Sequence, residues 1–269
     1  MAHKTIVGGT SYAIKGGKGM AGGTSFGVKK GKTMVDGTVY EIGFGQAISD
    51  LPVGASVFMN VNGAEKEFLI VHQGKPSTLY DDSCDGTWLL IKDLYESRAW
   101  HSSDANEYAN STIHSYLNST FLALFDSNIQ TAIKEVKIPY IKFDATYGTW
   151  KVASGANGLP AKIFLLSLYE VGFDKSVSQY FLEEGAKLDY FESGDTSGGT
   201  NRTKRIAYLN GTASAWWTRS ADTLETDQAF YIRSTGSYGY YYCSYAYRIR
   251  PALILPGDTL VDDNFKVIT

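Results

Sequence analysis

The sequence feature that most constrains the fold is a tyrosine-rich run near the C-terminus. Between residues 238 and 247, six of the ten positions are tyrosine, and the others are Gly239, Cys243, Ser244 and Ala246. If all six rings were buried, each hydroxyl would need an internal partner, because an unpaired buried hydroxyl costs about 1 to 3 kcal/mol. We therefore expect several of these rings to reach solvent.

This run has two interpretations. Tyrosine mixed with serine and glycine is typical of antibody-like contact surfaces, where each ring supplies a large area at a low entropy cost. The run can also be an antiparallel strand pair, in which alternate tyrosines pack and the others cover a sheet edge. The flanking segments, residues 216–220 (WWTRS) and 248–253 (RIRPAL), favour the first interpretation. Tryptophan packing and arginine hydrogen bonds there can fix the backbone while the side chains between them vary.

These considerations predict a frame and a binding surface. The predicted frame residues are Trp216, Trp217, Arg219 and Arg250. The predicted ligand-binding residues are Tyr231, Arg233, Ser237, Tyr238, Tyr240, Tyr241, Tyr242, Ser244, Tyr245 and Tyr247. Asp222 and Asp227, on the preceding loop, are further candidates, and an ordinary solvated carboxylate is the alternative for each. Because side chains alternate along a strand, only about half of the run can share one face.

Residues 7–45 contain a repeat with a period of 14 residues, marked by Thr10, Thr24 and Thr38. Apolar residues alternate within each unit, as in strands, and Gly-Gly, Lys-Gly and Asp-Gly pairs occupy positions where hairpin turns need positive φ. An isolated hairpin is only marginally stable in water. We therefore expect residues 1–48 to be a Gly-rich β-repeat region that oligomerises, most plausibly as a homotrimer, and attaches the chain to a larger assembly. A flexible Gly-rich leader is the alternative.

Composition excludes several classes of partner. The 269 residues carry a net charge of -3, so no basic stripe is available for nucleic acid. No apolar run is long enough for a membrane span, and no apolar signal core follows the N-terminus. Cys84 and Cys243 are far apart and form no ligand cluster with the histidines, which favours two free thiols over a disulfide. We expect no metal and no cofactor.

The middle of the chain predicts strands followed by helix. Residues 56–61 and 66–72 alternate around an Asn-Gly pair, which is a strong hairpin signal, and residues 87–91 predict a third strand of the same meander. Residues 113–125 carry apolar side chains at helical spacing, and the preceding Asn110-Ser111-Thr112 can cap such a helix.

No enzyme motif stands out. The chain shows no recognisable frame of paired carboxylates, no serine or cysteine nucleophile motif, no histidine metal spacing and no phosphate loop. We therefore expect a protein that is not an enzyme. One alternative is a structural tail or surface subunit, in which the tyrosines make subunit contacts. The other is a polysaccharide-acting enzyme, because two carboxylates can come from any part of a chain.

An ordered set of motifs resembles a known family. The set consists of Tyr108, Leu117-Asn118, Phe121, residues 163–167, Glu170, residues 216–220 and residues 250–253. In this order it resembles the C-type-lectin-like domains of bacterial and prophage surface-binding proteins. It is most similar to the variable proteins of diversity-generating retroelements, the class that includes the phage major tropism determinant.

This resemblance implies an α+β fold. A C-type-lectin-like (formylglycine-generating-enzyme-like) domain would cover residues 49–269, with a variable segment at about 216–250. It also implies a non-enzymatic receptor-binding protein or adhesin that binds a cell-surface protein or glycan. Such a protein would be found in the virion, at a phage tail, or on a bacterial surface after synthesis in the host cytoplasm, and the Gly-Gly-Thr repeats resemble those of phage tail proteins. The calcium-site signatures of animal C-type lectins are absent, so calcium-dependent sugar binding is not implied.

Overall fold

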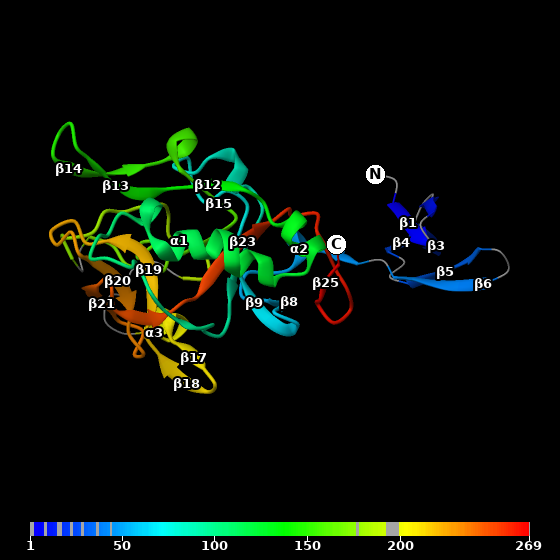
Figure 1. Ribbon diagram of the computed structural model, residues 1–269. Helices are drawn as coiled ribbons and strands as arrows, with labels where there is room; N and C mark the ends of the chain where they lie inside the picture. Colours follow the sequence, from blue (N-terminus) through cyan, green and yellow to red (C-terminus); the bar gives the residue numbers. More distant parts are fainter. Residues whose placement is uncertain are drawn as a thin grey trace.

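The repeat region forms three two-stranded antiparallel hairpins. The computed structural model describes residues 3–7, 10–14, 18–21, 24–27, 30–35, 38–43, 45–175, 178–191 and 199–268. The hairpin strands are β1 (His3–Val7) with β2 (Thr10–Ile14), β3 (Lys18–Ala21) with β4 (Thr24–Gly27), and β5 (Lys30–Val35) with β6 (Thr38–Gly43). The threonine of each repeat therefore begins the second strand of a hairpin. The Gly-Gly and Asp-Gly pairs predicted to form the turns, Gly8-Gly9, Gly22-Gly23 and Asp36-Gly37, lie outside the described residues. Figure 1 shows the hairpins to one side of the main body.

The centre of the main body is a five-stranded antiparallel sheet, called here the central sheet. Its order is β16 (Ile163–Leu165), β23 (Pro251–Leu255), β10 (Thr87–Ile91), β9 (Ala64–Gln73) and β8 (Ser56–Val61). The predicted meander is confirmed, because β8, β9 and β10 are neighbours in this sheet. Every residue of β10 and β23 is buried, which is why both read as continuous apolar runs rather than alternating ones.

A second five-stranded sheet carries the tyrosine run and is called here the tyrosine sheet. Its order is β11 (Ser97–Ala99), β22 (Ala246–Arg248), β19 (Trp216–Ala221), β20 (Gln228–Ile232) and β21 (Tyr238–Tyr242). Strands β19 and β22 are parallel, and the other pairs are antiparallel. Strand β21 is therefore at the edge of the sheet.

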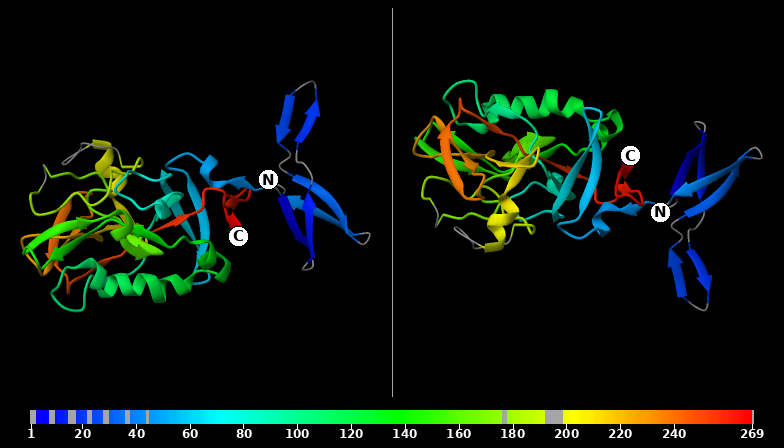
Figure 2. Two further views of the ribbon diagram at one scale, coloured as in Figure 1. Left: turned by 90° about the horizontal axis from the view of Figure 1, so that it is seen from above. Right: turned by 90° about the horizontal axis from the view of Figure 1, so that it is seen from below.

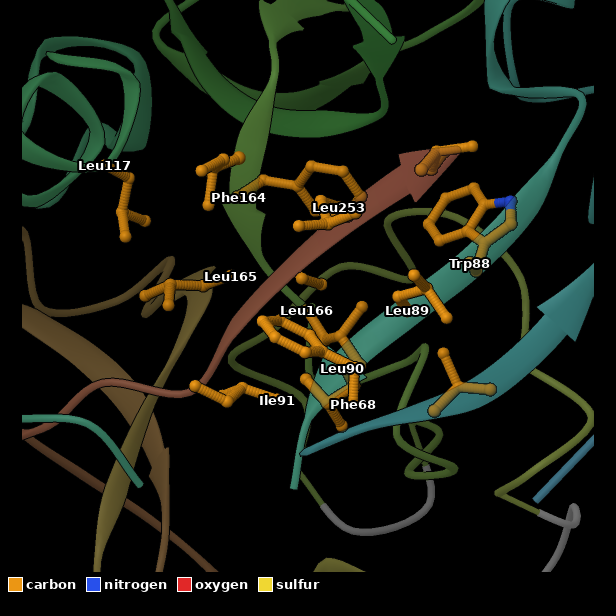
Figure 3. Close-up of a cluster of buried hydrophobic side chains, with 14 of the residues drawn as sticks. Phe68, Trp88, Leu89, Leu90, Ile91, Leu117, Phe164, Leu165, Leu166 and Leu253 are labelled. Carbon is orange, nitrogen blue, oxygen red and sulfur yellow. The ribbon is translucent and has the colours of Figure 1, made fainter. Parts of the chain in front are cut away.

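The hydrophobic core packs on the central sheet. Trp88 and Phe164 meet with ring centroids 5.5 Å apart, and Leu89, Leu117 and Leu253 are also buried. Figure 3 shows these side chains around the strands of the sheet, with Leu117 on the neighbouring helix. The two sheets belong to one continuous core, because Trp216 and Phe230 of the tyrosine sheet lie in the same buried cluster.

Smaller elements surround the two sheets. A three-stranded sheet has the order β25 (Val267–Ile268), β24 (Leu260–Val261) and β7 (Gln46–Ala47), which joins the end of the repeat region to the C-terminal strands. The remaining strand pairs are β12 (Val136–Ile138) with β15 (Leu159–Ala161), β13 (Tyr140–Asp144) with β14 (Thr149–Ala153), and β17 (Ala207–Leu209) with β18 (Thr212–Ser214).

The helices are short. The longest run joins α1 (Thr112–Tyr116) to the π-helical η4 (Leu117–Phe121) and the 3-10 turn η5 (Leu122–Leu124), and it lies along one side of the main body (Figure 2). Ser111 caps it as predicted, by accepting the backbone N–H of His114. The others are α2 (Ser127–Ala132), α3 (Gly199–Arg205) and the single turns η1 (Ile48–Asp50), η2 (Asp82–Cys84), η3 (Tyr108–Asn110) and η6 (Gly155–Asn157). None of the helices in the described ranges is long and apolar enough to cross a bilayer.

The expected fold class is wrong. The chain is predominantly β, with several small sheets beside the two larger ones, and it shows no clear α+β, C-type-lectin-like fold. The helical spacing of residues 113–125 is real but produces one interrupted segment. Elsewhere the apolar residues fall in short runs bounded by turn residues, and such runs pair as strands. The resemblance overestimated the helical share because its motifs are short pieces that lie mostly in strands and turns.

Candidate functional site

The tyrosine sheet is built on a fully buried strand, β19. All six of its residues are buried, although Thr218, Arg219 and Ser220 are polar. The two indole N–H groups bond to main-chain oxygens, from Trp216 to the carbonyl of Arg205 and from Trp217 to the carbonyl of Arg98, both at 3.0 Å. Buried polar groups that are all paired rigidify the structure around them.

Arg219 anchors this strand through a buried ion pair. Its guanidinium donates to both carboxylate oxygens of Glu170, at 2.6 and 2.7 Å, which is the strong bidentate geometry. It also donates to the carbonyls of Pro139 and Leu165, each at 3.0 Å. The pair therefore holds β19 to two segments far away in the chain.

A second carboxyl group, that of Glu184, lies beside the same guanidinium. Its Oε2 is 3.7 Å from Arg219 Nε, and its other oxygen accepts the Ser220 hydroxyl. Burial raises the pKa of Glu184 to about 7, despite the opposing effects of Arg219 and Ser220. One buried cation thus faces two buried carboxyl groups, and the cost of burying charge favours keeping Glu184 protonated.

Arg250 closes the frame on the other side. Its side chain donates to the carbonyls of Ile91 and Lys92, at 3.0 and 3.2 Å, and its guanidinium carbon lies 5.2 Å from the Trp216 ring centroid. Burial lowers the pKa of Arg250 to about 10. All four predicted frame residues are buried and hydrogen-bonded.

The exposed tyrosines are on the edge strand and the turn after it. Tyr240, Tyr241, Tyr242 and Tyr245 are 42 to 50% exposed, even though each carries a large ring. Alternation along β21 places Tyr240 and Tyr242 on the face of the sheet opposite to Tyr241. Tyr245 and Tyr247 join the face of Tyr241, with ring centroids 5.0 Å apart for Tyr241 and Tyr245 and 4.9 Å apart for Tyr245 and Tyr247.

Further aromatic rings connect Tyr241 and Tyr245 to the interior of the chain. Tyr247 stacks on Tyr231 with centroids 4.2 Å apart, and Trp217 meets Tyr247 at 4.9 Å. Tyr231 fits only because its cross-strand partner is Gly239, where an added Cβ would lie 2.6 Å from the ring. Burial and the neighbouring Tyr231 hydroxyl raise the pKa of Tyr247. Contacting aromatic rings therefore support Tyr241 and Tyr245 from below.

A shallow groove in two parts lies beside Tyr247 and reaches the edge strand β21. One part, of about 660 Å³, is lined by Ala215, Tyr231, Arg233, Ser234, Thr235, Ser237, Tyr238, Gly239, Tyr240 and Tyr247. The other part, of about 340 Å³, is lined by Ser97, Ala213, Ser214, Ala215, Ser234, Tyr245, Ala246, Tyr247 and Arg248. The two parts adjoin, because Ala215, Ser234 and Tyr247 line both.

A family model matches residues 85–257, and its description is "Domain of unknown function (DUF6273)". The match covers more than half of the 269-residue chain. The chain belongs to the DUF6273 family. The DUF6273 region contains β10 through β23. It therefore includes Trp216 and Trp217, the buried ion pair of Arg219 with Glu170, and all the tyrosines that line the groove. The repeat region and strands β8 and β9 precede it. Neither the curated proteins nor the solved structures gave a match.

Two predicted binding residues of the DUF6273 region are buried. Tyr231 is 8% exposed and forms part of the floor of the groove, so it supports the surface rather than extending from it. Asp222 is 1% exposed, and its Oδ1 accepts the backbone N–H groups of Leu224 and Glu225, so it organises a turn. The sequence could not show this burial, because aromatic and acidic residue types alone do not reveal which way a side chain points.

The other predicted binding residues are divided between the groove and its surroundings. Arg233, Ser237, Tyr238 and Tyr240 line the larger part, Tyr245 lines the smaller part, and Tyr247 lines both. Tyr241, Tyr242 and Ser244 are exposed but do not line the groove. Asp227 is half-buried, and its carbonyl accepts the N–H of Cys243 at 2.8 Å. Cys243 and Cys84 are both free and buried.

Sequence reasoning missed the residue that holds the loop before β20. The buried Asn106 donates from its side-chain amide to the carbonyls of Asp222, Glu225 and Gln228, at 2.7 to 2.9 Å. The loop is thereby held by a side chain more than a hundred positions earlier in the chain. No local signal could have identified this residue.

A larger depression, of about 700 Å³, lies between β9 and β11 and shares Ser97 and Arg248 with the smaller part of the groove. It has an acidic lining, and three of its four carboxylates are paired within the chain: Glu67 with Lys92, Glu96 with Arg98, and Glu65 with Lys266. We therefore place the candidate site at the groove beside the tyrosines.

Proposed function

We propose that this chain is a non-enzymatic receptor-binding protein that recognises its ligand through the exposed tyrosines and the adjoining groove. The observation that carries this proposal is the contrast within one sheet. Four rings are 42 to 50% exposed, while the strand two positions inward, β19, is completely buried and hydrogen-bonded. Large, stiff aromatic side chains on a rigid support suit binding, because little conformational entropy is lost on contact.

The groove lining supports binding over catalysis. Its described residues supply hydroxyl, guanidinium and methyl groups, and none of them is a carboxylate, histidine or cysteine. General acid–base catalysis most often uses one of these three kinds of group. The two cysteines lie elsewhere, and burial raises the pKa of Cys84 to about 12, which leaves its thiol inert.

The proposal is tested by removing rings without disturbing the frame. The triple variant Tyr240→Ser, Tyr241→Ser, Tyr242→Ser should lower adsorption to target cells at least about tenfold, since each lost aromatic contact is worth about a kcal/mol or more. Its melting temperature and oligomeric state should not change. Tyr147→Ser, which removes a ring that is 78% exposed in the β13–β14 connection, is the matched control and should adsorb normally.

Two results would point to the alternatives. Dissociation of the oligomer in the triple variant would show that the tyrosines make subunit contacts. Consumption of a cell-surface polysaccharide by the purified chain would show an enzyme.

We further propose that the repeat region assembles three chains and attaches them to a larger structure such as a phage tail. Each of its hairpins has only two strands, which is too few to be stable alone in water. Deleting residues 1–45 should therefore convert a trimer to a monomer in light scattering, while the tyrosine sheet stays folded. An unchanged oligomer size in that variant would rule the assembly role out.

A further inference from the structure

We infer that the groove takes an acidic glycan, that is, a sugar chain whose units carry carboxylate groups. This inference rests on the proposed binding function and adds the chemical class of the ligand. It follows from the chemistry of the lining, from one arginine and from the shape of the groove.

The first observation is the uniform chemistry of the larger part of the groove. Apart from Ala215 and Gly239, every residue that lines it carries a hydroxyl or a guanidinium group. Hydroxyls donate and accept hydrogen bonds, which suits the many hydroxyls of a sugar. The apolar surface of this part comes from Ala215, the methyl group of Thr235 and the tyrosine rings, and none of the described residues that line it is a leucine, isoleucine, valine, methionine or phenylalanine. A protein ligand would therefore find no aliphatic pocket for an anchoring side chain.

The second observation is Arg233, which is exposed at the start of the turn before β21. Its Nε donates to the carbonyl of Tyr238 at 2.9 Å, and this bond holds the guanidinium in place beside the groove. Among the ion pairs of the described residues, none involves Arg233. Its two terminal nitrogens can therefore bind a ligand carboxylate in the bidentate geometry that arginine prefers.

The third observation is the charge of the lining as a whole. Neither part of the groove is lined by a carboxylate, and Arg233 and Arg248 are its charged residues, in a chain whose net charge is -3. An anionic ligand therefore meets no like charge there. Two arginines are too few for a nucleic-acid backbone, whose binding needs many cationic contacts.

The fourth observation is the aromatic platform. Tyr245, 50% exposed, borders the smaller part of the groove beside the hydroxyls of Ser97 and Ser214. A flat ring flanked by hydroxyls fits the C–H face of a pyranose and its equatorial hydroxyls. The two adjoining parts of the groove leave room for more than one sugar unit.

The test uses the full-length chain on an array of carboxylated oligosaccharides, containing galacturonate, glucuronate, guluronate or sialic acid. Each is paired with its methyl ester, which keeps the sugar rings and removes the charge. At least one acidic member should bind, and its methyl ester should bind at least about tenfold more weakly. Arg233→Gln should weaken binding by a similar factor. Arg233→Lys should have an affinity between those of the parent and Arg233→Gln, because lysine keeps the positive charge but lacks the two parallel N–H donors of the guanidinium group.

Lys142→Gln on β13 removes one positive charge from a residue that does not line the groove, and it should bind like the parent. Equal melting temperatures for the three variants would exclude misfolding. The inference fails if no acidic oligosaccharide binds, if methyl esters bind equally well, or if a single-stranded oligonucleotide binds in their place. Cell adsorption that depends on the tyrosines but occurs without acidic-glycan binding would leave the receptor-binding function standing and overturn the ligand class.

Discussion

Replacing Arg219 with methionine should destabilise the chain by about 3 to 5 kcal/mol, because it leaves the carboxylate of Glu170 buried without its cation. Methionine keeps much of the side-chain volume, so the loss will come mainly from charge and hydrogen bonds rather than from a cavity. The variant also loses the bonds to Pro139 and Leu165 that tie β19 to its neighbours. Urea denaturation followed by circular dichroism measures the change in unfolding free energy.

Two further variants isolate the electrostatic part of this effect. Adding Glu170→Gln to Arg219→Met should recover part of the lost stability, because the double variant contains no unpaired charge at that position. Lys92→Met breaks the partly exposed pair with Glu67 and should cost no more than about 1 kcal/mol. A double variant less stable than the single one would show that packing, not charge, dominates at Arg219.

The second prediction with a large expected effect is that the free energy of unfolding depends on pH through Glu184. The folded state holds the pKa of this carboxyl at about 7, above its ordinary value of 4.5. Below about pH 4.5 the group is protonated in both states, so its contribution to stability is fully present. As the pH rises towards 7, the unfolded state releases the proton and the folded state keeps it. Stability should therefore fall by on the order of 3 kcal/mol across this window and stay lower above it.

Glu184→Gln mimics the protonated side chain and should remove this part of the pH dependence. The variant should be more stable than the parent at pH 8, and the difference should shrink or reverse at pH 4. Glu183→Gln, at the preceding position, is the matched control and should follow the parent at both pH values. A constant difference between Glu184→Gln and the parent at all pH values would show that the pKa of Glu184 is the same in the folded and unfolded states.

The sequence predicted local features better than spatial relations. The Asn-Gly hairpin, the Ser111 cap and the burial of Trp216 and Trp217 could be predicted because each depends on neighbouring residues or on residue size. The fold class could not, since it depends on how short strands pair across the chain. Likewise, Glu184 and Asn106 were missed because their partners lie 35 or more positions away and no spacing rule connects them.

The tyrosine residues also show that composition predicts exposure in general but not the position of each side chain. Composition predicted that several rings would reach solvent, and four are exposed. It could not show that Tyr231 is covered, because that depends on the missing side chain of Gly239 across the strand. Nor could it locate the groove, because four of the nine residues that line its smaller part, Ser97 and residues 213–215, lie far from the tyrosine run in the sequence.

The hydrogen bonds that hold the frame end largely on main-chain oxygens. Trp216, Trp217, Thr218 and Arg250 donate to the carbonyls of Arg205, Arg98, Phe230 and Ile91, respectively. Because every amino acid supplies the same carbonyl, the acceptor positions can be mutated without removing these bonds. The tyrosine sheet is accordingly a suitable starting point for randomised libraries. In such libraries positions 240–242 and 245 would vary, while the buried frame residues and their hydrogen bonds would stay the same.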